Sequence, residues 1–462
     1  MKKIIALLLA AMMIVAVFAS CGGGGGNGGS TDSKSDTKSS DEGGNEDTFD
    51  YTKFSDENTG KGFDANVIDD DFGGETGANL KVWAPDAYAK LLKEQCDAFA
   101  KKYADKNIKI TVSVQSEDSA GTKLQTDASA SADVFGFASD QLTKLKNAGC
   151  LNPVPTPFAA DINATNIKNA VEVCADELDG DQTLFCYPET GNGYFLVYDK
   201  SVVSDDDAKT LEGVLAACEK AGKKFIMDAG NGYYACMFVF TGGLELAGLE
   251  KDGTTQKFND YKEDDVVASM KAFSTLMHKY KNTFVSNGTG TIPSGFTKDS
   301  KGVSKCGAGI DGNWDSAGIK KALGDNFGAS KLPTININGE DKQIVSMYGY
   351  KMIGVNSASK YPNTSQVLAY YLSSEECQNQ RAEQLGWSPT NNKSVESEVV
   401  QNDVAIKALI AQSEYSVPQA NVSSSIWDPL ANLGKKLYDD NTDPASYDFN
   451  KLLKDTVTNI NM

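Results

Sequence analysis

The sequence is short of the residue types that catalysis most often uses. Its 462 residues include one histidine, His278, and one arginine, Arg381. A single histidine leaves no catalytic dyad and has no ligand-spaced partner for zinc. The P-loop, G-x-S-x-G and H-E-x-x-H motifs are missing as well. We therefore expect a protein that is not an enzyme and that holds no metal or cofactor.

Positive charge is also scarce. Lysine and arginine number 44 against 63 aspartates and glutamates, which gives a formal net charge of −19. More than half of this excess falls between residues 22 and 79, where 14 acidic residues stand against 4 lysines. No basic cluster is evident, and proteins that bind nucleic acid need one. The sequence therefore argues against nucleic acid as a partner.

The N-terminal apolar run is too short to span a membrane. It covers residues 4–17, whereas a spanning helix needs roughly 20 residues. With M-K-K before it, the run predicts a signal peptide over residues 1–20. The sequence F-A-S-C at residues 18–21 resembles a bacterial lipobox, with Phe18 in place of the usual aliphatic residue. We expect lipid on Cys21 to anchor the protein on the extracellular face of the cytoplasmic membrane.

The segment 21–78, which begins with the lipidated cysteine, has few aliphatic residues. It is rich in glycine, serine and aspartate, a composition that cannot bury a core and predicts a disordered acidic linker. As a random coil it spans on the order of 40 Å. The body from residue 79 to 462 is long enough for two domains of ordinary size.

Eight cysteines remain in the body, and none forms a C-x-x-C motif. Their wide spacing leaves both disulfides and free thiols open, and apolar surroundings favour buried thiols. They are Cys96, Cys150, Cys174, Cys186, Cys218, Cys236, Cys306 and Cys377.

Strand and helix patterns alternate along the body and predict an α/β fold. A strand at 80–83, a helix at 86–103 and a strand at 108–114 form the first unit. A break at Pro188 is expected to mark a crossing between two lobes. Further strands are predicted at 133–137, 184–188, 193–198, 224–227, 307–311 and 348–355, and helices at 141–148, 210–221, 264–280, 366–372, 375–385, 404–413 and 426–438.

Four short patterns, in this order, resemble the family of extracellular solute-binding proteins typified by maltose-binding protein. The first is N-L-K-V-W at 79–83 with its following helix and strand. The second is D-V-F-G-F at 133–137, leading to G-C-L-N-P at 149–153. The third is Y-P at 187–188 followed by F-L-V-Y-D-K at 195–200, where Asp199 replaces the usual Asn. The fourth is A-G-I-D-G-N-W at 308–314, followed by L-P-T at 332–334.

The resemblance implies a two-lobed periplasmic-binding-protein-like fold of type II, with a ligand cleft between the lobes. It implies an N-terminal lobe from residues 79–189 plus 335–390 and a C-terminal lobe from 190–334 plus 391–462. The crossings are expected near 187–191, near 331–335 and after Pro389. The implied function is that of a monomeric substrate-binding lipoprotein of an ABC transporter, which delivers its ligand to membrane permease subunits.

Aromatic residues in the expected cleft favour a sugar, because aromatic rings stack on the apolar faces of pyranose rings. The resemblance places Trp314, after a predicted strand, and Trp427, near the last helices, in this cleft. Trp387 lies near the last crossing and is a further candidate. Trp83 lies within its strand, and we expect it to pack in the core.

Polar candidates come from both lobes. The G-N-G-Y sequence at 191–194 and again at 230–233 predicts turns. By resemblance, Asn192, Asn231 and Tyr233 contact ligand from one lobe. Asp86, Phe137 and Asp140 contact it from the other lobe, at the carboxyl ends of strands.

The near absence of arginine favours a neutral, hydroxyl-rich ligand, a sugar or oligosaccharide, over a phosphate or carboxylate. Other functions stay open at this point. The protein could bind a non-sugar solute such as a polyamine or a metal chelate, degrade glycans at the cell surface, or act as an adhesin that lacks a closing cleft.

Overall fold

The computed structural model describes residues 59–420 and 422–462. Its first unit confirms the predicted strand, helix and strand: β1 (Asn79–Ala84), α3 (Asp86–Lys102) and β2 (Lys109–Val114). Strands β1 and β2 are parallel, with Asn79 opposite Lys109. Helix α3 buries Leu91, Leu92, Cys96 and Phe99 because the helical period brings these residues to one face.

The other predicted elements form close to the expected bounds, because each has a clear apolar period. Gly149 follows α5 with a φ of 66°, the left-handed conformation in which glycine commonly ends a helix. The elements are β3 (Val134–Ala138), α5 (Leu142–Asn147), α8 (Leu211–Lys220), β7 (Lys224–Met227), α11 (Glu263–Lys279), β11 (Cys306–Gly312), β15 (Ser346–Val355), α14 (Pro362–Leu372), α15 (Glu375–Leu385), α18 (Val404–Ser413) and α19 (Trp427–Tyr438).

Several elements were not anticipated, most of them short and without a strong period. They are the helices α4 (Glu117–Thr126), α6 (Thr156–Thr165), α7 (Lys168–Glu172), α9 (Gly232–Ala235), α10 (Met237–Phe240), α12 (Ile292–Phe296), α13 (Ser316–Leu323), α16 (Asn392–Val395), α17 (Glu398–Asn402) and α20 (Phe449–Ile460), the hairpins β4 (Ala175–Leu178) with β5 (Asp181–Leu184), β8 (Leu246–Leu249) with β9 (Gln256–Phe258) and β13 (Thr334–Ile337) with β14 (Glu340–Gln343), and the strands β10 (Phe284–Ser286), β12 (Phe327–Ser330) and β16 (Ser416–Pro418).

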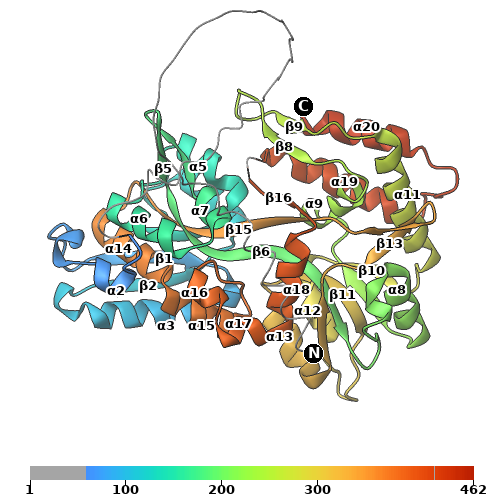
Figure 1. Cartoon of the computed structure of the whole chain (residues 1–462), viewed down its shortest axis with the longest axis horizontal. Coiled ribbons are helices and arrows are strands. Elements are labelled where there is room, and N and C mark those ends of the chain that lie inside the picture. Colours follow the sequence, from blue (N-terminus) through green and yellow to red (C-terminus); the bar gives the residue numbers. More distant parts are fainter. Residues whose placement is uncertain (1–58, 421) are drawn as a thin grey trace, which may run out of the picture. The chain divides into compact units, whose positions relative to one another are not determined.

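Two long strands cross the body of the molecule. Strand β6 (Cys186–Asp199) pairs antiparallel with β15 at the middle of a sheet of order β10-β7-β11-β6-β15-β3-β1-β2 (Figure 1). The predicted break at Pro188 is wrong, because β6 runs through it without interruption. Pro188 pairs with Met352 and Thr190 with Lys351, so Glu189 is the extra residue of a β-bulge. A bulge accommodates a proline that cannot donate to the ladder.

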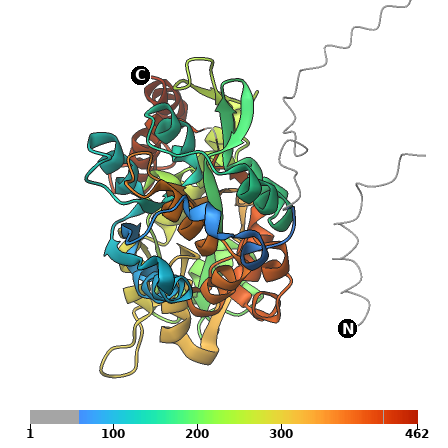
Figure 2. The ribbon, with the colours of Figure 1, turned by 90° about the vertical axis from the view of Figure 1, so that its left-hand side faces the viewer.

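Two large buried clusters define the two lobes. The first lobe is built around core residues between 63 and 187 and between 352 and 387, and the second around core residues between 194 and 347 and between 417 and 460. The first lobe is seen end on in Figure 2, where the early blue segments lie beside the orange α14 and α15. A smaller cluster covers the other face of the second lobe's strands, from Phe195 to Leu409.

The predicted second crossing near residues 331–335 is wrong, because these residues stay in the second lobe. Leu332, Ile335, Ile337 and Ile344 all belong to its buried cluster, where the β13–β14 hairpin contacts α8 and α11. The crossing is β15 itself. The expected N-terminal lobe boundary at residue 335 therefore precedes the change of lobe. A third connection follows α17, which contacts α15 in the first lobe, while α18 contacts β12 in the second.

The end of the predicted linker is also wrong, because residues 59–78 belong to the folded body. Helix α2 (Phe63–Asn66) places the Phe63 ring 5.2 Å from that of Tyr370, and the 3-10 turn 69–72 places Phe72 4.9 Å from Tyr103. These two rings, and the hydrogen bonds that Glu75 accepts from Asn363 and Thr364, hold the segment against the first lobe. Cys21, the signal peptide and the rest of the linker lie outside the described residues.

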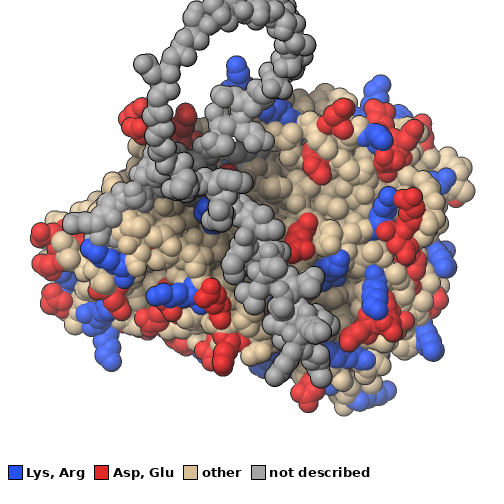
Figure 3. Space-filling view, viewed as in Figure 1, with Lys and Arg blue, Asp and Glu red and all other residues tan. Residues whose placement is uncertain are grey.

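All eight body cysteines are free and buried, which confirms that buried thiols are favoured. Burial raises the pKa of the Cys236 thiol to about 12, so this thiol stays protonated. No helix in the described ranges combines the length and apolar character needed to cross a membrane. On the face shown in Figure 3, acidic and basic side chains of the described residues are interspersed.

Candidate ligand-binding cleft

A cleft of about 1200 Å³ lies between the two lobes, with the crossing strands at its floor. Pockets for drug-sized ligands are about 300–1,000 Å³, so this one has room for a larger molecule. The first lobe contributes Pro85, Ala87, Glu117, Ala138, Asp140 and Trp387 to the lining. The second contributes Asn231, Tyr233, Trp314, Asp315, Ser425 and Trp427, and the crossing strands contribute Asn192 and Lys351.

Three aromatic side chains form one wall of the cleft. The ring centroid of Tyr233 lies 6.1 Å from that of Trp314 and 6.3 Å from that of Trp427. Both tryptophans are half-buried: each packs against the second core and also lines the cleft. Such a wall offers flat apolar surfaces to a ligand.

The sequence G-N-G-Y at 230–233 positions Tyr233 in this wall. Asn231 caps α9, and its Oδ1 accepts a hydrogen bond from the Tyr233 backbone at 2.9 Å. A Cβ atom on Gly232 would lie 2.3 Å from the Trp427 carbonyl oxygen, so only glycine lets the two segments approach. The second G-N-G-Y sequence therefore forms the turn before α9, and its Gly232 lets this segment pack closely against the backbone of Trp427.

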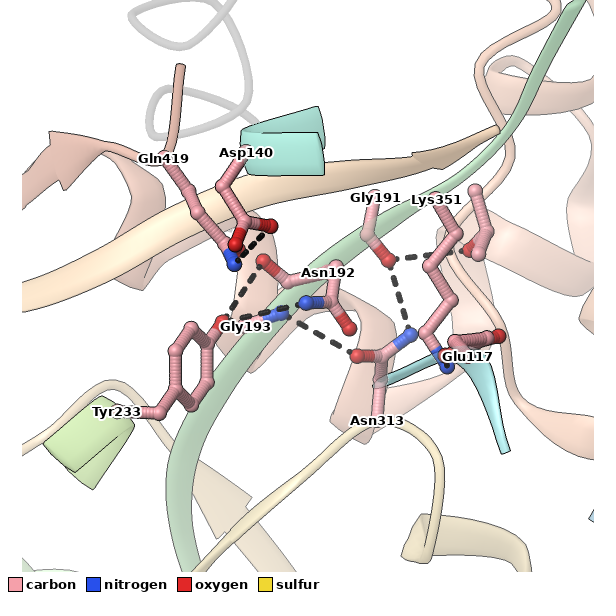
Figure 4. Close-up of polar contacts among 10 residues, drawn as sticks. Glu117, Asp140, Gly191, Asn192, Gly193, Tyr233, Asn313, Lys351 and Gln419 are labelled. Carbon is pink, nitrogen blue, oxygen red and sulfur yellow. Dashed lines mark hydrogen bonds and ion pairs between the residues drawn. The ribbon is translucent and has the colours of Figure 1, made fainter. Parts of the chain in front are cut away.

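Asparagines organise the floor of the cleft (Figure 4). Asn313 accepts a hydrogen bond from the Gly193 backbone at 3.3 Å and donates one to the Gly191 carbonyl at 3.0 Å. Asn192 donates to the Tyr233 hydroxyl at 3.3 Å. The Asn192 Oδ1 is buried and has no hydrogen-bond partner among the described residues. A ligand hydroxyl can donate a hydrogen bond to this oxygen.

A contact across the cleft joins the first lobe to the segment after β16. Gln419 donates from Nε2 to Asp140 Oδ1 at 3.0 Å, and Ser139 donates to the Gln419 carbonyl at 2.5 Å (Figure 4). The Gln419 Oε1 is buried and has no hydrogen-bond partner among the described residues. This amide is therefore a second acceptor available to a ligand donor.

A buried ion pair lies in the lining of the cleft. Lys351 Nζ is 2.9 Å from Glu117 Oε2, and the two side chains are 5% and 13% exposed. The ammonium lies 4.8 Å from the ring centroid of Trp387 and 5.8 Å from that of Trp314. Burial raises the pKa of the Asp315 carboxyl to about 6, and nearby Lys351 lowers it. The part of the cleft around Lys351 is thus charged, unlike the aromatic wall.

The structure places seven of the nine predicted contact residues in the lining: Asp140, Asn192, Asn231, Tyr233, Trp314, Trp387 and Trp427. Of these, Trp387 is almost wholly buried and belongs to the first core. Trp83 is half-buried against that core, as expected, and lies outside the cleft lining.

Asp86 and Phe137 do not line the cleft, and their immediate neighbours do. Asp86 begins α3 and is exposed, while Pro85 and Ala87 face the cleft. Phe137 is fully buried, with its ring 5.6 Å from that of Phe135. Successive side chains of a strand point to opposite faces, so Ala138 takes the cleft position.

Sequence reasoning missed Glu117, Lys351, Asp315 and Gln419. A signal existed for Lys351, since it is a lysine in the middle of an otherwise apolar strand. Glu117 begins a helix of weak period, and Gln419 lies in a loop, so neither had a local signal.

Two lobes joined by crossing strands around a cleft define a two-lobed binding protein. The chain belongs to the family described as bacterial extracellular solute-binding protein, whose model matches residues 94–408. The maltodextrin binding protein MalE1 from L. casei BL23, solved without ligand, is 25% identical over 83% of this chain and 99% of its own, with a TM-score of 0.67.

More distant structures share the fold. MalX from Streptococcus pneumoniae, in complex with maltopentaose, is 22% identical over 82% of this chain and 99% of its own, with a TM-score of 0.66. The Thermus thermophilus maltotriose binding protein, bound with maltotriose, is 20% identical over 83% and 99%, also with a TM-score of 0.66. No curated protein matches the chain in sequence. The expected family and the two-lobed α/β fold are confirmed.

Proposed function

We propose that the chain is the substrate-binding lipoprotein of an ABC importer, which captures a sugar or oligosaccharide and delivers it to permease subunits without chemical change. The observation that carries this proposal is the aromatic wall of Tyr233, Trp314 and Trp427 facing the cleft. Pyranose rings have apolar faces that stack on such side chains.

The polar groups of the cleft fit a ligand rich in hydroxyls. Asn192 Oδ1, Gln419 Oε1 and Glu117 Oε1 are buried acceptors that have no hydrogen-bond partner among the described residues. Leaving such atoms unpaired costs free energy, and ligand hydroxyls can donate to all three. The size of the cleft, and the maltopentaose and maltotriose bound by MalX and the Thermus protein, support an oligosaccharide.

The family is extracellular, and we propose that lipid on Cys21 holds the protein at the outer face of the cytoplasmic membrane. A monomer suffices, because one chain supplies both walls of the cleft. Replacing Cys21 by Ser tests the anchor: the variant should leave the membrane fraction and appear in the medium, whereas unchanged membrane association would contradict lipidation at this residue.

Ligand binding is tested with the chain lacking residues 1–20 and carrying Cys21→Ala. Intrinsic tryptophan fluorescence and melting temperature are measured against maltodextrins, other oligosaccharides, monosaccharides, amino acids and polyamines. A response to one class of sugar supports the proposal. A response to polyamines alone would move the assignment to a non-sugar solute, and cleavage of a glycan would replace it with an enzyme.

A further inference from the structure

The cleft extends past the aromatic wall, on the side of Trp427. Beyond this residue, its lining continues along the loop 422–425 to the β8–β9 hairpin and to the end of α20. Helix α5 of the first lobe supplies the opposite side. We call this part of the cleft the outer region, and it is lined by Leu249, Thr254, the loop 422–425 and Asn461 of the second lobe and by Lys144 and Asn147 of the first.

Gln256 joins the second-lobe parts of the outer region. This residue begins β9 and is 2% exposed. Its Oε1 accepts a hydrogen bond from the Ser423 backbone at 2.9 Å, and its own N–H donates to Asn461 Oδ1 at 2.9 Å. Asn461 donates in return from Nδ2 to the Gln256 carbonyl at 3.1 Å. Because Ser423 leads to Trp427, the hairpin, the loop and the end of α20 continue the aromatic wall, and β8, β9 and α20 lie together in Figure 1.

The tip of the β8–β9 hairpin is held in one conformation. Asp252 Oδ1 accepts hydrogen bonds from the backbone N–H groups of Thr254 and Thr255, each at 2.8 Å. The side chain of Thr254 is exposed and that of Leu249 is half-buried, so a ligand can contact both. A preformed wall loses little conformational entropy on binding, and this favours affinity for a ligand that reaches it.

The chemistry of the outer region suits a neutral sugar. Lys144 is the one ionisable side chain among its lining residues, whereas the lining near Lys351 holds a buried ion pair. Hydroxyl and amide side chains, such as those of Ser425 and Asn147, can exchange hydrogen bonds with sugar hydroxyls. Leu249 offers an apolar contact to the face of a sugar ring.

We propose that the outer region is an additional subsite, which binds the sugar units of an oligosaccharide that extend beyond the aromatic wall, so that the protein selects longer chains over disaccharides. The inference rests on the proposed function, because it requires a sugar on the aromatic wall. A further sugar unit adds free energy of binding only where the protein supplies surface for it to contact, since the gain follows the area removed from water. The outer region supplies such surface from both lobes.

The test measures Kd by calorimetry for the series from maltose to maltoheptaose, and for the series from cellobiose to cellohexaose. In the series that binds, the wild-type Kd should fall about tenfold from the trisaccharide to the hexasaccharide, a change of about 1.4 kcal/mol. The double variant Leu249→Ala, Thr254→Ala should lose most of this gain and should keep the Kd of the disaccharide within about twofold, because distant sites act independently. Lys251→Ala is the matched control, since Lys251 is exposed at the same tip and lies outside the cleft lining.

The outcomes separate this inference from the function on which it rests. A wild-type Kd that does not fall beyond the trisaccharide overturns the inference and leaves the function standing. An equal loss for short and long chains in the double variant also overturns it, because the hairpin would then act through the aromatic wall. If the double variant does not fold, Asn147→Ala on the exposed end of α5 decides, and it should weaken only the longer chains. Absence of any sugar binding by the wild type overturns both.

Discussion

The two sides of the cleft differ in chemistry. The second lobe presents Tyr233, Trp314 and Trp427, while the first lobe and the crossing strands present Asp140, Asn192 and the Glu117–Lys351 pair. Aromatic faces stabilise a sugar whatever the orientation of its hydroxyls, so we expect this side to supply affinity. Hydrogen bonds to buried acceptors depend on where each hydroxyl lies, so we expect the other side to supply selectivity. Single substitutions on each side of the cleft test this difference.

Trp387 provides the largest expected effect, and it is an effect on stability. The residue is 1% exposed and packs against Tyr88 at a centroid distance of 5.1 Å. Trp387→Ala should lower the free energy of unfolding by about 3–5 kcal/mol, because it leaves a cavity in the first core. Guanidinium unfolding measures this loss, and Trp387→Phe should restore most of it. An unchanged unfolding midpoint would show that Trp387 belongs to the cleft and not to the core.

Trp314 and Trp427 should behave in the opposite way. Trp314→Ala and Trp427→Ala should each weaken oligosaccharide binding by roughly 2–4 kcal/mol without unfolding the protein, because each is a half-buried aromatic anchor. Calorimetry gives the affinity, and circular dichroism checks the fold. Trp83→Ala is the control, since Trp83 lies outside the cleft lining. Unchanged affinity in both cleft variants would refute the aromatic wall as the source of affinity.

Asn192 tests the polar side. Asn192→Ala should weaken binding by about 1–2 kcal/mol, because it removes a buried acceptor and the hydrogen bond to Tyr233. The loss should be larger for the preferred sugar than for an analogue lacking the hydroxyl that donates to Asn192. Asn441→Ala, in an exposed turn, should leave affinity unchanged. Equal losses for all analogues would mean that Asn192 shapes the floor without reading a hydroxyl.

Salt provides the smallest expected effect. A neutral sugar should bind with nearly the same Kd at low and high salt, within about twofold, because the Glu117–Lys351 charges are buried and paired. Calorimetry in 50 and 500 mM NaCl measures the change, with the concentrations chosen to span a several-fold change in Debye length. A large loss of affinity at high salt would point instead to a charged ligand such as a polyamine.

Many of the longer strands and helices of the body were predictable, because each carries its own pattern of apolar residues, whereas most of the short elements and the amphipathic α20 were missed. Helices α11 and α18 form within a residue of the predicted bounds. Failures occur where a distant contact decides the outcome. The composition of residues 59–78 is that of a linker. The contact that places them in the folded body joins Phe63 to Tyr370, more than three hundred positions away in the sequence.

The cleft residues likewise include some that were predicted correctly and some that were not. Family resemblance placed Trp314, Trp427, Asn192 and Tyr233 in the cleft, and all four side chains line it. Phe137 was placed one position away from the true lining residue, Ala138, because the sequence does not say which face of β3 meets the core. In a strand, an error of one position exchanges core and cleft.

The α/β class, the order of the predicted elements and the scarcity of histidine and arginine follow from the sequence alone, and the family resemblance added the tryptophans of the cleft. Contacts between distant parts of the chain fix the rest: β6 runs through Pro188, β15 is the second crossing, and Lys351 pairs with Glu117 near two tryptophan rings. The reason is the distance along the sequence over which each interaction acts. Apolar periodicity acts between near neighbours in the chain, whereas an ion pair joins residues that only the folded sheet brings together.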